Sequence, residues 1–194
     1  MLDTQNTQLP APRVPVVDKI GQLMERSWYR FFSNLYNYFI SLPYGSFYNT
    51  GVHTAAANTP TAITFDSSAN TRNTSIGTPA SRVVFSADGL TTVTFSIQFS
   101  NSSTSEDDVF VWLRKNGVDV PYTSSAVTVP KKHGPVDGTA ILAANFYEVY
   151  GPGDYLELYW LTVNGTTSMT TIPATTSPAK PASPSVVLTV SQII

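Results

Sequence analysis

Residues 90–99 read LTTVTFSIQF, and two kinds of side chain alternate along this stretch. The side chains expected to face a core are Thr91, Val93, Phe95, Ile97 and Phe99. Those between them carry hydroxyls or an amide: Thr92, Thr94, Ser96 and Gln98. Successive side chains of an extended strand point to opposite faces. The alternation therefore predicts a half-buried strand with one apolar face and one hydroxyl face.

Outward from this strand, turn signals divide the second half of the chain. Asp88-Gly89 comes before it, and Asn116-Gly117 and the turn at residues 151–154 follow; Asp-Gly and Asn-Gly pairs suit tight hairpins. The expected strands are 90–99, 109–115, 140–150, 155–162 and 185–194. Short strands at this spacing predict a mainly β fold with the architecture of a jelly-roll β-sandwich. Residues 163–184, rich in Thr, Ser, Ala and Pro, are expected to form a long extended loop.

The first 43 residues follow a different pattern. Residues 1–17 contain Pro10, Pro12 and Pro15, which favour an extended arm. Aromatic and apolar residues then recur with the spacing of one helix face: Trp28, Phe31, Phe32, Leu35, Tyr36 and Phe39. This spacing predicts a helix from about Met24 to Ile40. The expected organisation is an arm and anchoring helix at 1–43 and a β head domain at 44–194.

Composition excludes several classes of protein. Charged residues make up 12% of the chain and the net charge is −2, so a basic nucleic-acid surface is not expected. The chain has no cysteine, which excludes disulfides, thiolate metal sites and cysteine nucleophiles. No apolar run reaches the length of a membrane span, and the N-terminus lacks the pattern of a signal peptide. We expect a protein made in the cytoplasm, without insertion into a membrane.

The residues that could carry metal chemistry do not form a site in the sequence. His53 and His133 lack ligand-type partners at metal-binding spacing. Glu106, Asp107 and Asp108 are consecutive, but successive strand residues alternate faces, so they cannot all contact one Ca²⁺ ion. They favour a charged loop that keeps a sheet edge soluble.

Catalytic residue patterns are also missing. Asp154 fits a turn and Glu157 an alternating strand face, which is favoured over a catalytic pair. The sequence has no motif for a catalytic triad or a phosphate-binding loop. We expect no enzyme activity, no cofactor and no metal.

Two segments of the chain resemble structural proteins of tailed bacteriophages. PRVPVVDKIGQLMERSWYRFFSNLY, within residues 10–36, resembles their shared N-terminal segment, in which a Pro-rich arm, an Asp-to-Gly turn and a Trp-centred helix follow one another. SRVVFSADGLTTVTFSIQFS, VFVWLRKNGVDVP, GPGDYLELYW and PSVVLTVSQI are similar to the β domain of phage fibres and spikes. That domain is similar to the trimeric jelly rolls of the tumour-necrosis-factor and complement-head type.

The resemblance implies a virion protein with a trimeric head. The aromatic helix could pack on its own β domain or insert into another protein, and the extended arm favours insertion. The expected anchor comprises Pro12, Arg13, Val14, Pro15, Trp28, Phe31, Phe32, Leu35, Tyr36 and Phe39. Strands 140–150 and 155–162 are largely apolar or aromatic on both faces, so we expect a copy of the chain to cover them and form a homotrimer.

Loops gather at the ends of a jelly roll, and binding residues lie there disproportionately. We expect exposed polar loops at 101–108, 123–138 and 164–176. Two interpretations stay open: the loops contact a glycan or protein of the host surface, or they are plain connectors of a fibre that serves only as decoration. The candidate binding residues are Asp107, Asp108, Lys131, Lys132, His133 and Asn164. The alternative is a free-standing soluble jelly-roll carbohydrate-binding module whose helix caps its own domain.

Overall fold

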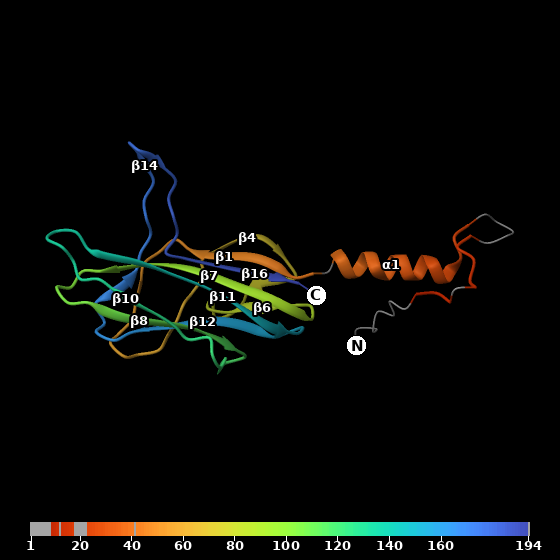
Figure 1. The fold of residues 1–194 in the computed structure, drawn as a ribbon, viewed down its shortest axis with the longest axis horizontal. Helices are drawn as coiled ribbons and strands as arrows, with labels where there is room; N and C mark the ends of the chain where they lie inside the picture. Colours follow the sequence, from red (N-terminus) through yellow and green to blue (C-terminus); the bar gives the residue numbers. More distant parts are fainter. Residues whose placement is uncertain (1–8, 12, 18–22, 41, 194) are drawn as a thin grey trace. The chain divides into compact units, whose positions relative to one another are not determined.

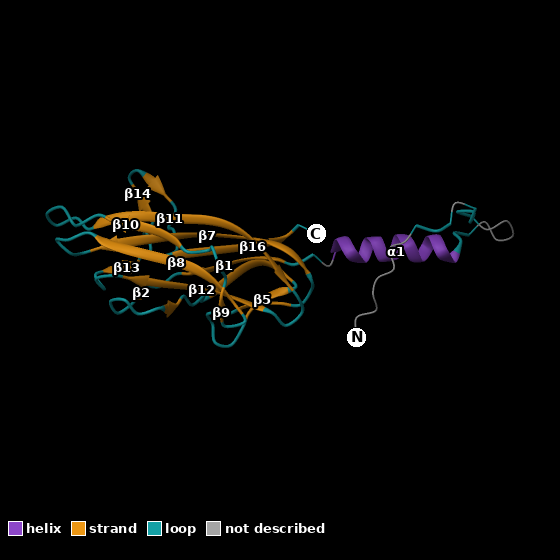
Figure 2. Ribbon diagram, turned by 60° about the horizontal axis from the view of Figure 1, so that its bottom comes forward, coloured by secondary structure: helices purple, strands orange, loops and turns teal. Residues whose placement is uncertain are grey.

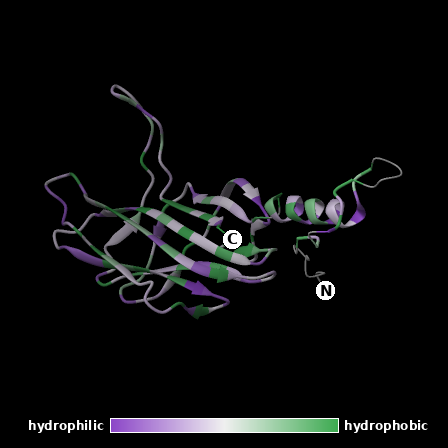
Figure 3. Ribbon diagram, turned by 45° about the vertical axis from the view of Figure 1, so that its right-hand side comes forward, coloured by the Kyte–Doolittle hydropathy of each residue, from purple (hydrophilic) through white to green (hydrophobic). Residues whose placement is uncertain are grey.

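The alternating stretch forms the centre of strand β7 (Gly89–Asn101). Its inward side chains from Val93 to Phe99 are at most 1% exposed, whereas Thr94 on the other face is open to solvent. The polar side chains thus stay hydrated while the apolar ones leave water. The predicted strand and its two faces are confirmed, and Figure 3 shows the resulting bands of opposite hydropathy along the strands.

The computed structural model describes residues 9–11, 13–17, 23–40 and 42–193. The chain divides into two compact units, Met1–Leu42 and Pro43–Ile194. The first unit holds the helix α1 (Arg26–Ile40), which begins two residues later than expected and ends where expected. The boundary between the units lies one residue before the expected one.

One sheet of the second unit is built around β7 (Figures 1 and 2). Its strand order is β2, β13, β7, β16, β1 and β4, and β11 pairs with the other edge of β7. The strands are β1 (Tyr44–Asn49), β2 (His53–Thr54), β4 (Ser67–Arg72), β11 (Gly138–Tyr150), β13 (Thr167–Met169) and β16 (Val186–Gln192). All of their pairings are antiparallel.

The second sheet packs against the first. Its strand order is β10, β8, β12, β6 and β5, with β3 pairing with β12 and β9 with β8. The strands are β3 (Thr61–Ala62), β5 (Thr74–Ile76), β6 (Val83–Phe85), β8 (Asp107–Lys115), β9 (Val118–Asp119), β10 (Ser125–Val129) and β12 (Tyr155–Thr162). The two antiparallel sheets confirm a mainly β jelly-roll sandwich preceded by one helix.

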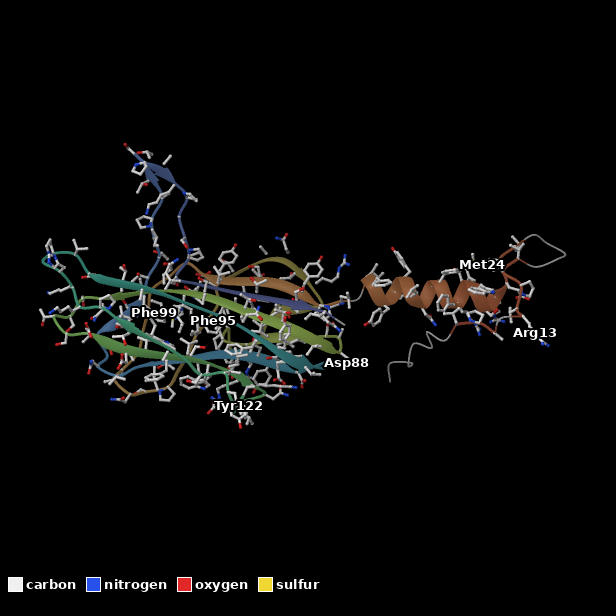
Figure 4. All side chains as sticks on the ribbon, viewed as in Figure 1. Arg13, Met24, Asp88, Phe95, Phe99 and Tyr122 are labelled. Carbon is white, nitrogen blue, oxygen red and sulfur yellow. The ribbon has the colours of Figure 1, made fainter. Side chains whose placement is uncertain are left out.

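The core lies between the two sheets and is rich in aromatic rings. Phe99 of β7 and Trp160 of β12 lie 6.0 Å apart across it, and Phe85 stacks on Tyr150 at 4.2 Å. Figure 4 shows Phe95 and Phe99 pointing into this layer. Contacts between the sheets therefore hold the domain together, in the absence of any disulfide.

Two turn expectations differ from the structure. Asn116-Gly117 forms the expected hairpin turn, with φ of 51° and 81°. Asp88-Gly89 does not join paired strands, because β6 belongs to the second sheet and β7 to the first. The dipeptide instead carries the chain across the sandwich, and the side chain of Gln192 fills the space where a Cβ of Gly89 would lie.

The expected loop at 163–184 contains regular structure. Residues 167–169 form β13, and β14 (Thr175–Thr176) pairs with β15 (Ala179–Lys180) in a separate two-stranded ribbon. This ribbon rises from the first sheet, as Figure 1 shows. Each of its strands has two residues, Thr175–Thr176 and Ala179–Lys180, which is too short for a strand pattern to show in the sequence.

Candidate functional site

The helix α1 presents an aromatic face that its own unit does not bury. None of the residues of α1 is buried, and Tyr29, Tyr36 and Phe39 are between 62% and 65% exposed. Phe32 stacks on Trp28 at 5.9 Å and meets Phe31 edge-on at 5.4 Å. Trp28, Phe31 and Phe32 thus form one cluster of rings on the helix, and such clusters are typical of anchoring interfaces.

Trp28 also ties the arm to the helix. Its indole N–H donates to the backbone carbonyl of Val14 at 3.0 Å. Val17 and Met24 form an isolated β-bridge, and the N–H of Glu25 donates to the carbonyl of Val16. The arm therefore folds back beside the start of the helix.

The remaining anchor candidates divide by exposure. Arg13 and Pro15 are exposed, and Leu35 is half-buried like Trp28 and Phe31. Pro12 lies outside the described residues. Val14 is half-buried. Its backbone carbonyl accepts the Trp28 indole N–H, so this carbonyl stabilises the first unit itself.

Parts of the three expected binding loops meet at one end of the sandwich, but two of the expected ranges are not loops throughout. Residues 125–129 of the second form strand β10, and residues 167–169 of the third form β13. The N–H of Lys132 donates to the carbonyl of Ser103 at 2.8 Å, which joins the first loop to the second. Asn164 donates from its amide to the carbonyl of Glu106 at 3.1 Å, which joins the third loop to the first. Lys131, His133, Asp108 and Asn164 are exposed there, and Lys132 is half-buried.

Asp107 does not belong to this exposed set, and its placement in a binding loop is wrong. The residue is 1% exposed at the start of β8. Its carboxylate accepts hydrogen bonds from the Thr162 and Thr166 hydroxyls and from the backbone N–H groups of Asn164, Thr166 and Thr167. Burial raises the pKa of Asp107, but these hydrogen bonds outweigh it and hold the pKa below the ordinary value of 3.8. Asp107 thus organises the turn at residues 162–167.

Asp154 and Glu157 occupy structural positions. Asp154 accepts the N–H of Gly151 at 2.9 Å and closes the turn between β11 and β12. Glu157 is 5% exposed and accepts the Ser81 hydroxyl at 2.6 Å, with Arg82 3.8 Å away. Within the described residues, no group of three or more His, Asp or Glu side chains could hold a metal ion.

The outward face of the second sheet carries aromatic rings interleaved with arginines. Arg114 lies over the ring of Tyr159 at 4.3 Å, and Arg82 over that of Tyr155 at 4.2 Å. The sequence predicts a neighbouring copy over strand 155–162. In the single chain the two arginines already cover part of this face, and Tyr155 and Tyr159 are half-buried. Alternation in the sequence places these residues on one face, but it does not show that they stack on one another.

Trp112 extends this aromatic face. Its ring lies 6.0 Å from that of Tyr159, and its indole N–H donates to Asp119 at 2.8 Å. Tyr122, at the lower edge in Figure 4, is fully exposed and has a φ of 64°. A bulky residue in this left-handed conformation is strained.

The outward face of the first sheet has a different character. Cross-strand pairing places its residues in three rungs over β1, β16, β7 and β11. The rungs are Tyr48, Val187, Ser96 and Ala143; Ser46, Thr189, Thr94 and Asn145; and Tyr44, Ser191, Thr92 and Tyr147. We name these residues the uncharged face, because none carries a charge. Ile141 and Val149 continue it along β11, at 60% and 57% exposure.

A hollow of about 480 Å³ opens on this face at the foot of the β14–β15 ribbon. It is lined by Ser46, Tyr48, Thr50, Thr171, Ile172, Pro173, Ala182, Ser183, Pro184 and Val187. The lining is mainly apolar and contains no charged side chain. The sequence placed residues 171–184 in a loop, so it could not predict that they wall a hollow.

These two sheets and their strand order define a jelly-roll β-sandwich. The solved structure of the Eiger TNF from S. frugiperda is similar, with a TM-score of 0.51 and 10% sequence identity. The alignment covers 79% of this chain and 94% of that one. At this identity the similarity shows the fold alone.

Sequence comparisons give no further assignment. No family model matches the chain, and no curated protein matches it. No helix in the described part of the chain is long and apolar enough to cross a membrane. The resemblance to phage proteins therefore remains an interpretation of the sequence.

Proposed function

We propose that this chain is a non-enzymatic structural protein of a tailed-bacteriophage particle. It is a fibre or spike component of the collar or neck, the head or the tail. The arm and α1 anchor it to another virion protein, and the β domain forms a homotrimeric head. The exposed loops at one end of the head contact a host surface glycan or protein.

The observation that carries this proposal is the aromatic face of α1. A helix in water gains most of its stability by burying an apolar face. Here no residue of α1 is buried, and the aromatic rings from Trp28 to Phe39 are accessible for contact with a partner. A second protein that covers these rings would supply the missing burial.

The uncharged face supports the trimeric head. Interface cores are depleted in charged residues and enriched in aromatic ones. The face carries Tyr44, Tyr48 and Tyr147, with Ile141 and Val149 exposed beside them. A copy of the chain that covered this face would bury side chains that a monomer leaves in water.

A deletion of residues 1–43 tests the anchor. Particles assembled with the truncated chain should lack it, while the remaining domain stays folded by circular dichroism. Particles assembled with the full chain provide the control. If the truncated chain joins particles in normal amounts, the anchor assignment is wrong.

A free-standing carbohydrate-binding module is the second candidate, and the aromatic face of the second sheet favours it. The Trp112 ring can stack on a sugar, and the neighbouring Asp119 carboxylate can bind the sugar's hydroxyls. Titration with a panel of oligosaccharides, repeated with Trp112→Ala, distinguishes the two candidates. Saturable binding that Trp112→Ala abolishes, by a chain absent from purified particles, would favour the module.

A further inference from the structure

Strands β13 and β16 are two parts of one interrupted strand. Met169, the last residue of β13, pairs with Phe99, and Val186, the first of β16, pairs with Ile97. The N–H of Gln98, between them on β7, donates to the carbonyl of Ser185 at 2.9 Å. The chain therefore leaves the sheet after Met169 and returns at the adjacent position.

The excursion is an ordered hairpin that projects from the first sheet (Figure 1). Two hydrogen bonds between the backbones of Ile172 and Ser183 close its foot, and the Thr175 hydroxyl donates to the carbonyl of Pro178 at 2.6 Å near its tip. Every residue from Pro173 to Ala182 is exposed. We name residues 173–182 the arm hairpin. Three prolines limit its backbone freedom, so docking would cost little further ordering.

The position of the arm hairpin constrains any partner of the uncharged face. The hairpin rises beside the rungs formed by Tyr48, Val187 and their neighbours, so a second copy cannot lie flat on this face. The second copy must receive the hairpin in a recess. Each copy carries such a recess, the hollow of about 480 Å³.

The chemistry of the two parts also matches. The arm hairpin consists of Pro, Ala, Thr and Ser with one charge, Lys180, and the hollow is lined by uncharged side chains. Thr50, in the wall of the hollow, donates from both its N–H and its hydroxyl to Asp66 at 2.8 Å. The exposed Asp66 carboxylate therefore lies at the rim of the hollow, and its negative charge is opposite to the positive charge of Lys180.

We propose that the arm hairpin docks into the hollow of a second copy of this chain, with Lys180 next to that copy's Asp66. This inference rests on the proposed homotrimer and names the contact that closes it. Each copy gives one hairpin and receives one, and a head-to-tail contact of this kind gives a closed trimer when successive copies are related by a rotation of one third of a turn.

An intermolecular disulfide tests the contact, because the natural chain has no cysteine. The double variant Ser177→Cys, Ser46→Cys places one thiol at the hairpin tip and one in the hollow. The tip lies about 13 Å from its own foot by strand rise, beyond disulfide reach within one chain. Mild oxidation of the full chain should give covalent dimers and trimers on a non-reducing gel.

Two controls locate the disulfide. Ser177→Cys alone should give few covalent species, because the tips do not meet one another. Ser177→Cys with Val118→Cys should also give few, because Val118 is exposed on β9 of the other sheet. Equal cross-linking by either control would overturn the docking of the tip in the hollow.

A deletion tests how much the arm hairpin contributes to the stability of the trimer. Removal of residues 170–184 joins Met169 to Ser185 and leaves one residue opposite Gln98, so the register on β7 is kept. The trimer of this variant should dissociate at a protein concentration at least tenfold higher. Lys180→Glu should weaken the trimer by a smaller factor, and adding Asp66→Lys should restore it.

The outcomes separate the inference from the proposed function. If the wild-type chain is a trimer, the double cysteine variant gives no cross-link and the deletion does not change the stability of the trimer, then the docking of the arm hairpin is overturned. The proposed trimer is unaffected by that result. A wild-type monomer at micromolar concentration overturns both. If the deletion variant fails to fold, the cross-link and the charge exchange decide the question.

Discussion

Asp107 accepts a hydrogen bond from the Thr162 hydroxyl in the buried end of the sandwich, and so links the first residue of β8 to the last residue of β12. The same carboxylate accepts the N–H groups of Asn164 and Thr167. One buried carboxylate therefore organises the turn that leads from the second sheet back to the first. Asn164, in this turn, also donates from its side-chain amide to the backbone carbonyl of Glu106, so the turn is joined to the exposed loop that precedes β8.

Substitution Asp107→Ala should destabilise the head domain by about 2–4 kcal/mol, because it leaves several buried donors without an acceptor. Urea unfolding followed by tryptophan fluorescence measures this. Asp108→Ala is the matched control: Asp108 is exposed and should cost less than about 1 kcal/mol. Equal effects of the two substitutions would contradict the structural role of Asp107.

The same residue predicts the response to acid. The pKa of Asp107 lies below 3.8 in the folded chain, so the unfolded chain binds the proton more tightly. The stabilisation from this carboxylate is complete above pH 3.8 and is lost as the pH falls through the lower, folded-state pKa. Asp107→Asn should reduce the dependence of the unfolding free energy on pH below 3.8. An unchanged slope would show that Asp107 does not contribute.

The proposed anchor predicts that substitutions on the aromatic face of α1 reduce incorporation into the particle and that substitutions on its opposite side do not. Trp28→Ala and Phe32→Ala should each cost about 2–4 kcal/mol of binding to the particle, because both rings belong to the aromatic cluster of the helix. Quantitative immunoblots of purified particles measure the incorporation. Asn37→Ala, on the opposite side of the helix from Trp28, should incorporate normally. Collapse of the β domain in the aromatic variants would refute the assignment.

The Trp28 indole adds a finer test of the arm. Trp28→Phe keeps an aromatic ring but removes the N–H that binds the carbonyl of Val14. If this bond positions the arm for docking, incorporation should fall less than with Trp28→Ala but remain below the natural level. Normal incorporation of Trp28→Phe would restrict the role of Trp28 to its ring.

The parts of this molecule that sequence could predict are those with a local pattern. The alternation around Phe95 predicted β7, and the spacing from Trp28 to Phe39 predicted α1, because burial on one face fixes each period. The uncharged face follows less directly. The sequence shows which residues of β11 face outward, but their neighbours on β16 and β1 come from pairing between distant segments.

The features that sequence missed depend on tertiary contacts. Asp107 looked like part of a charged run with Glu106 and Asp108, and only the distant turn at 162–167 buries it. Met169 belongs to a three-residue strand that has no pattern of its own and exists because β7 offers the next free position. Asp88-Gly89 has the composition of a hairpin turn, yet the strands around it pair elsewhere.

A charge on the uncharged face should prevent assembly without unfolding the chain. Ile141→Lys places an ammonium group on β11, at a position that is 60% exposed in the single chain. In a trimer this charge would be buried without a partner, at a cost on the order of 2–5 kcal/mol. Val118→Lys, 70% exposed on the second sheet, is the matched control and should assemble normally.

The mass of the full natural chain in solution tests the central claim most directly. Sedimentation equilibrium at micromolar concentration should give three times the chain mass of 21.0 kDa, and Ile141→Lys should give the single chain mass. A natural chain that sediments as a 21.0 kDa monomer would contradict the trimeric head.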